Sequence, residues 1–212
     1  MQQVIWRALC LAALTLFALG SGLCSVLGSV AYAQDTVRVR GTIDRVEGPI
    51  YVVKSRDGAE LKVALAENGI VVAIVKASLA DIKPGLFVGS SGMPLPDGSQ
   101  KAIEVHIFPE AMRGAGEGHY PWDLQANSTM TNANVEETVA GVEGQTLTLK
   151  YKTGEKKVVV TPQTAIVTYN PGDKNDLQPG TKIFIAAAKK QADGTLQAAR
   201  INYGKDGLTP PM

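Results

Sequence analysis

Cysteine is nearly absent from the sequence. Of the 212 residues only Cys10 and Cys24 are cysteines, and both lie within the first 33 residues. A chain that begins after Ala33 therefore contains no disulfide, no free thiol and no cysteine metal site. The lack of thiols suits an oxidising export compartment, where stray cysteines cross-pair.

The sequence also lacks an excess of charge of either sign. One basic residue, Arg7, precedes Ala33, and the remaining basic residues equal the 20 acidic ones in number. A nucleic-acid binder needs a basic surface, often with aromatic side chains on which bases stack. This chain has no basic block, and aromatic residues make up only 6% of it. We therefore expect no nucleic-acid partner.

Motifs of the common enzyme classes are missing as well. No serine lies in a G-x-S-x-G elbow, and the chain has neither a phosphate-binding loop nor a dinucleotide fingerprint. With two histidines in the chain, general bases are few. The sequence predicts no catalytic residue, no metal ligand set and no cofactor.

Long apolar runs are confined to the N-terminus. The run after Arg7 carries no charge before Asp35 and contains Ala31-Tyr32-Ala33, the small-x-small pattern that signal peptidase cleaves. We interpret residues 1–33 as a secretory signal, which predicts a periplasmic or secreted protein that begins at Gln34 and has no membrane span. The alternative is an uncleaved signal that tethers the protein to the inner membrane, because the run is long enough to cross a bilayer.

The chain does contain an internal repeat. Residues 81–85 (DIKPG) match residues 176–180 (DLQPG), and every other match has the same offset of 95 or 96 residues. Duplication is the expected cause of so many matches at one offset. We therefore expect two units, residues 34–109 and 135–212, joined by a connector at 110–134. The other matches are 46–48 with 142–144, 57–58 with 153–154, 97–98 with 193–194, and 102–105 with 198–201.

Within each unit the apolar residues alternate with polar ones, as they do in strands. In residues 146–152 (TLTLKYK), Leu147, Leu149 and Tyr151 share one face. Asp-Gly and Thr-Gly pairs suit hairpin corners, and the Pro-Gly pairs suit type II turns. This pattern predicts an all-β protein with two tandem small OB-like barrels of five to six strands each, because closure removes exposed strand edges. A pair of small β-sandwiches is the alternative.

The order of these turns and strands resembles that of exported bacterial OB-like β-barrel domains of unknown function. The residues that carry the resemblance are 46–48, 81–85 and 97–105, with their partners in the second unit. They are turn and core positions, so the resemblance implies a fold and an exported location. It implies no catalytic residue.

Glu104 and His106 form a polar pair in residues 102–108 (AIEVHIF). Ile103, Val105 and Ile107 alternate with them and are expected to face the core, which places both polar side chains on the opposite face. Such a pair could help to bind a metal. The second unit has Arg200 and Asn202 at these positions, so we expect an ordinary solvated face.

The connector contains the stretch 116–124 (GEGHYPWDL), which allows three interpretations. Trp122 and Tyr120 could pack between the barrels as a clasp, since both favour half-buried positions. The stretch could instead be a ligand-binding surface, or a metal or proton-transfer site. We expect the clasp. The candidate binding residues are Glu117, His119, Tyr120, Trp122 and Asp123.

These observations together predict a non-enzymatic binding or scaffolding module of the cell envelope. Its partner would be an unknown envelope protein or a small ligand. The alternative function is a periplasmic metal-dependent or hydrolytic enzyme that uses Glu117, His119 and Asp123.

Overall fold

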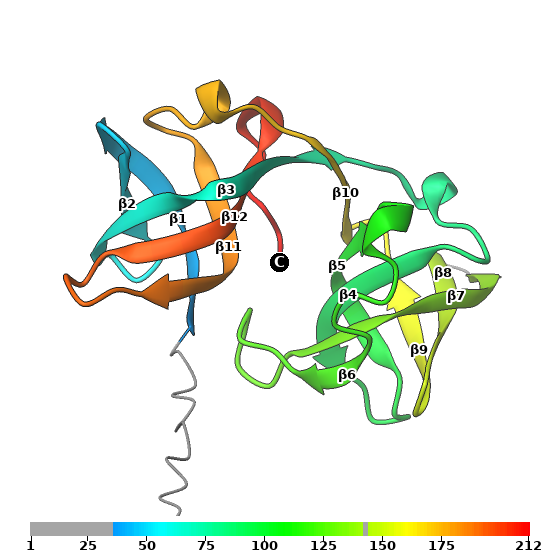
Figure 1. Ribbon diagram of the computed structural model, residues 1–212. Coiled ribbons are helices and arrows are strands. Elements are labelled where there is room, and N and C mark those ends of the chain that lie inside the picture. Colours follow the sequence, from blue (N-terminus) through cyan, green and yellow to red (C-terminus); the bar gives the residue numbers. More distant parts are fainter. Residues whose placement is uncertain (1–35, 142–143) are drawn as a thin grey trace, which may run out of the picture. The chain divides into compact units, whose positions relative to one another are not determined.

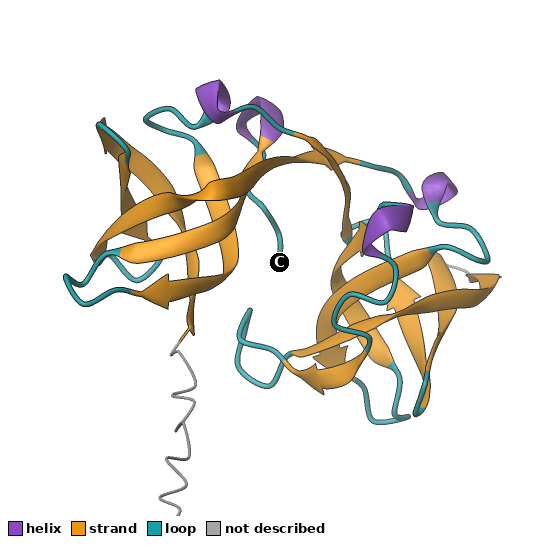
Figure 2. Ribbon diagram, in the orientation of Figure 1, coloured by secondary structure: helices purple, strands orange, loops and turns teal. Residues whose placement is uncertain are grey.

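The structure is a computed structural model that describes residues 36–141 and 144–212 (Figure 1). The expected signal at residues 1–33 lies outside the described residues, as do two residues of the second Val-Glu-Gly motif. The described chain is all-β, with three short 3-10 helices between strands and a fourth after the last strand (Figure 2). None of its helices is both long and apolar enough to cross a membrane.

The first barrel is built from the two ends of the described chain. Its strands pair in a closed circuit, in which β12 hydrogen-bonds to both β11 and β3. In Figure 1, blue and cyan strands therefore lie beside orange and red ones. The five strands are β1 (Thr36–Glu47), β2 (Ile50–Ser55), β3 (Glu60–Lys76), β11 (Lys182–Lys190) and β12 (Leu196–Gly204).

The second barrel is one uninterrupted segment, residues 87–160. Here β5 pairs with both β4 and β9, which closes the circuit. A short strand, β6 (Gly118–Pro121), adds to β7 beside the circuit. The five strands of the barrel are β4 (Phe87–Pro94), β5 (Gln100–Ile107), β7 (Thr129–Gly141), β8 (Gly144–Tyr151) and β9 (Gly154–Val160).

The predicted fold class, all-β with small five-stranded OB-like barrels, is confirmed. The boundaries expected at 34–109 and 135–212 need correction, because each barrel takes strands from both segments. The second barrel is inserted in the chain between β3 and β11 of the first. The expected connector at 110–134 contributes β6 and the start of β7.

The two barrels use the same pairing scheme. In the first barrel β1, β2 and β3 pair in succession, as β7, β8 and β9 do in the second. The strands β11 and β12 then close the first circuit in the way that β4 and β5 close the second. The closing pair of strands therefore follows the three successive strands in the first barrel and precedes them in the second.

Alternation along the strands fills each barrel with aliphatic side chains. Val63 in the first barrel and Leu147 and Leu149 in the second are fully buried. Tyr151 packs against the same core as the two leucines, so the face predicted for residues 146–152 is confirmed.

A pair of strands links the two barrels. The second part of β3 pairs antiparallel with β10 (Ala165–Pro171), and β10 runs parallel to β5. At the centre of the β3–β10 ladder Ile74 pairs with Tyr169. Neighbouring residues of β3 lie in the core of the first barrel, so Ile74 faces the other side, in a third apolar cluster. The other buried members of this cluster are Val167, Phe184 and Met212.

Candidate functional site

Strand β6 and the residues after it place the predicted connector side chains on two opposite sides. His119 and Asp123 are exposed, whereas Tyr120 and Trp122 are half-buried. This alternation follows from the extended backbone, which turns successive side chains to opposite faces. The predicted residues therefore do not form a single cluster.

Glu117, His119 and Asp123 have separate partners. The Glu117 carboxylate accepts a hydrogen bond from the backbone N of Lys152 at 3.0 Å. His119 Nδ1 lies 2.8 Å from Thr131 Oγ1, and Asp123 pairs with arginines of β1. Within residues 36–141 and 144–212 no group of three or more His, Cys, Asp or Glu side chains could hold a metal ion. In the structure each of these three side chains therefore contacts a different partner.

The contacts of His119 determine which of its ring nitrogens carries a proton. Gln100 donates through Nε2 to the Thr129 carbonyl at 2.7 Å, so its Oε1 is the acceptor for the Thr131 hydroxyl at 3.0 Å. With its only proton used, the Thr131 hydroxyl accepts from His119 Nδ1. Burial and, after it, the charge of Lys156 lower the pKa of His119. The ring is therefore held as a hydrogen-bond donor to the strand beneath it.

Trp122 links the segment after β6 to strand β1 of the first barrel. The Arg38 guanidinium carbon lies 3.8 Å from the centre of the Trp122 ring, a cation–π contact. Asp123 accepts from Arg38 at 2.7 Å and from Arg40 at 2.8 Å. Trp122 also packs against the third apolar cluster, which includes Phe184 of β11. These are the contacts that a clasp requires.

A cavity of about 360 Å³ borders the third apolar cluster, of which Phe184 and Met212 line it. Both barrels contribute to its lining: His106 and Asn132 come from the second, and Arg200 and Asn202 from the first. Apolar and aromatic side chains supply most of the remaining wall. The cavity is in the size range of small-molecule sites, which combine an apolar wall with a few polar groups. The aromatic members of the wall are Phe108, Tyr120, Trp122, Tyr169 and Phe184.

Four buried polar side-chain atoms in this lining have no hydrogen-bond partner among the described residues. Two are donors, Arg38 Nε and Trp122 Nε1, and two are acceptors, Asn132 Oδ1 and Asn202 Oδ1. The amide orientations are fixed, because each Nδ2 donates to a backbone carbonyl, at 3.1 and 3.0 Å. Buried polar groups nearly always have partners, so each of these atoms calls for a partner such as an ordered water, an ion or a ligand. Arg38 also borders a larger depression of about 770 Å³, whereas another of about 500 Å³ near Lys54 includes none of the four residues.

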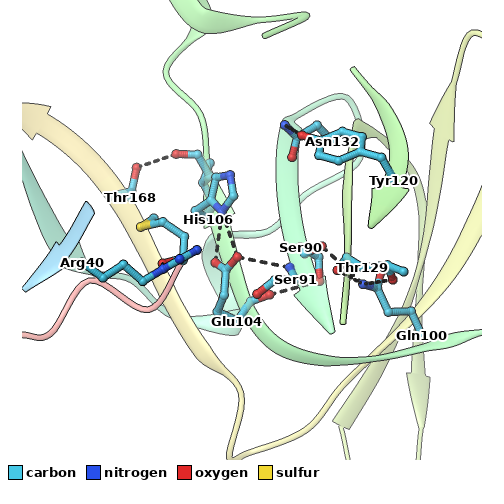
Figure 3. Close-up of polar contacts among 12 residues, drawn as sticks. Arg40, Ser90, Ser91, Gln100, Glu104, His106, Tyr120, Thr129, Asn132 and Thr168 are labelled. Carbon is cyan, nitrogen blue, oxygen red and sulfur yellow. Dashed lines mark hydrogen bonds and ion pairs between the residues drawn. The ribbon is translucent and has the colours of Figure 1, made fainter. Parts of the chain in front are cut away.

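His106 lines this cavity, and the carboxylate of Glu104 lies against its ring (Figure 3). Glu104 is 0% exposed and His106 is 3% exposed, so the prediction of a solvated face is wrong. His106 Nδ1 lies 3.0 Å from Glu104 Oε2, and Ser91 N donates to Glu104 Oε1 at 3.1 Å. Both side chains do point away from the barrel core, as predicted. That face is covered because the rings of Phe108 and Tyr169 pack edge-on against the imidazole.

Gly89 leaves room for the second imidazole nitrogen. A Cβ at this position would lie 2.1 Å from His106 Nε2 and 2.5 Å from Asn132 Oδ1. Any larger residue would therefore displace these two atoms. Since Nδ1 is engaged by Glu104, Nε2 is the nitrogen left for other contacts.

The polar side chains on the outer faces of β5 and β12 differ at corresponding positions of the two barrels. Glu104 pairs with Ala165 in the β5–β10 ladder, and Arg200 pairs with the corresponding Ile70 in the β12–β3 ladder. In the same way, Asn202 is the counterpart of His106. The sequence contained this signal, because polar residues occupy this face of the strand in both units. The sequence did not show that the outer faces of both barrels line one cavity.

The fold and the site together define an all-β protein with two five-stranded barrels and a cavity lined by polar and aromatic residues. Comparison of the chain with family models, curated proteins and solved structures gives no match.

Proposed function

We propose that this protein is an exported, non-enzymatic binding module of the cell envelope that holds a small organic ligand in the cavity. One observation carries the proposal: four of the six buried, unpartnered polar side-chain atoms among the described residues belong to side chains that line this cavity. Leaving such an atom without a hydrogen bond costs roughly 1 to 3 kcal/mol, so a ligand that supplies partners would gain binding free energy from each bond.

The chemistry of the lining supports binding rather than catalysis. The hydrolytic alternative relies on Glu117, His119 and Asp123, each of which contacts a different partner. A small ligand is favoured over an envelope protein as the partner, because the unpartnered atoms line a cavity.

The exported location rests on the sequence. Residues 1–33 have the features of a secretory signal, and the chain after them is free of cysteine. The resemblance to exported OB-like domains and the pairing scheme common to both barrels support a duplicated module of this class.

The test is a fragment screen followed by NMR of residues 34–212. Trp122 is the only tryptophan in this segment, its side chain lines the cavity, and its indole N–H has no hydrogen-bond partner among the described residues. Fragments that bind there will shift the single indole cross-peak. A library that leaves this peak unmoved would overturn the proposal.

A matched pair of variants locates the binding. Ala186 lines the cavity and Ala187, beside it on β11, does not, although both are exposed. Ala186→Phe should weaken binding of the fragments at least about tenfold, equivalent to about 1.4 kcal/mol. Ala187→Phe should leave it unchanged. Equal effects of the two substitutions would place the fragments elsewhere.

A further inference from the structure

On the basis of the proposed function, we infer that the ligand is a monocarboxylate with an apolar body, and that Arg200 binds its carboxylate. Arg200 is half-buried in β12 and lines the cavity. The inference follows from the charge of the lining and from the contacts of this one guanidinium.

Arg200 has a poor set of partners. Its Nη1 lies 3.1 Å from Met112 Sδ, a thioether that accepts hydrogen bonds weakly. No ion pair joins Arg200 to a carboxylate in the part of the chain that the structure describes. A guanidinium carries five N–H donors in a planar fork that matches a carboxylate. Most of its donors are therefore left for a ligand.

The other charged side chains at the cavity each lie against a polar or charged partner. Arg38 pairs with Asp123 at 2.7 Å, and His106 lies against Glu104. Of the two arginines in the lining, Arg38 has a carboxylate partner, whereas no ion pair joins Arg200 to a carboxylate among the described residues. One negative charge on the ligand would neutralise Arg200.

The apolar part of the wall indicates what the rest of the ligand is made of. The rings of Phe108 and Tyr169 stack with centroids 5.6 Å apart, and Trp122 contributes a further aromatic surface. An aliphatic or aromatic body would bury its surface here at roughly 25 cal/mol per Å². A multiply charged ligand, such as a nucleotide, would place charge against these rings.

The test compares carboxylates with uncharged analogues of the same shape. Phenylacetate, phenylpropionate and octanoate, and the primary amide of each, are titrated into residues 34–212 while the Trp122 indole cross-peak is followed. We expect the carboxylates to bind at least about tenfold more tightly than their amides. In Arg200→Gln the carboxylates should fall to the affinity of the amides. Arg45→Gln, at an exposed arginine outside the cavity, should change neither.

Two outcomes overturn the inference and leave the proposed function intact. One is equal binding of amides and carboxylates to the unsubstituted protein, and the other is a carboxylate preference that survives in Arg200→Gln. If no member of either series shifts the indole peak, the monocarboxylate assignment fails. The fragment screen then decides the proposed function separately.

Discussion

At the scale of single residues, Trp122 and His119 have different structural roles, although they lie three positions apart. Trp122 packs on Arg38 and the third apolar cluster, whereas His119 is exposed and bonds to Thr131. Trp122→Ala should lower the free energy of unfolding by about 2 to 4 kcal/mol, as for other large aromatics that lose their packing. His119→Ala should lower it by less than about 1 kcal/mol. Urea unfolding of the two variants measures this, and a larger loss in His119→Ala would contradict the clasp.

The ion pairs of Asp123 give a pH dependence at the same scale. Burial alone would raise the pKa of Asp123, but hydrogen bonds from Arg40 and Arg38 outweigh it and hold the pKa at about 2. The carboxylate therefore stabilises the fold above its unfolded pKa of 3.8, and this contribution is lost as the pH falls towards 2. Thermal unfolding of the protein and of Asp123→Asn should differ at neutral pH and converge over that range. A constant difference would show that the charge is not involved.

At the scale of elements, the chain order of the strands leads to a prediction about fragments. All five strands of the second barrel lie in residues 87–160, whereas residues 34–109 hold three strands of one barrel and two of the other. A fragment of residues 78–164 should fold alone and unfold cooperatively. A fragment of residues 34–109 should not, because neither of its partial barrels can close. Circular dichroism during heating distinguishes them, and the reverse result would contradict the insertion.

Much of the local structure could be predicted because it depends on neighbouring residues. The strand faces follow from alternation, and the Pro-Gly pairs form the expected turns. Gly85 and Gly180 adopt φ of 88° and 90°, and each turn is closed by a hydrogen bond across it, as in Leu86 N to Lys83 O.

The choice of partner strands could not be predicted from the same evidence. In a repeat of five strands, the last two of one unit can complete the circuit of either unit, and the sequence pattern is identical in both cases. The site was missed for the same reason. Whether Glu104 and His106 face water depends on β10 and its Tyr169, which lie about 60 residues further along the chain.

At the scale of the whole molecule, export is the prediction that concerns every residue. If residues 1–33 are a cleaved signal, the protein recovered from the producing cell should begin at Gln34. The reason is that Ala31-Tyr32-Ala33, near the end of the apolar run, has the small-x-small pattern that signal peptidase cleaves. N-terminal sequencing and intact mass measure this. A mass that retains the first 33 residues would favour the membrane-tethered alternative.

The insertion of one barrel within the other also determines how the molecule would respond to mechanical force. Thr36 and Gly204 belong to the same barrel, so tension applied between them passes through the β1–β11 and β11–β12 ladders. Residues 87–160 carry no load until those ladders part. Under stretching, the cavity would therefore lose its Arg200 wall first, while the second barrel is still folded.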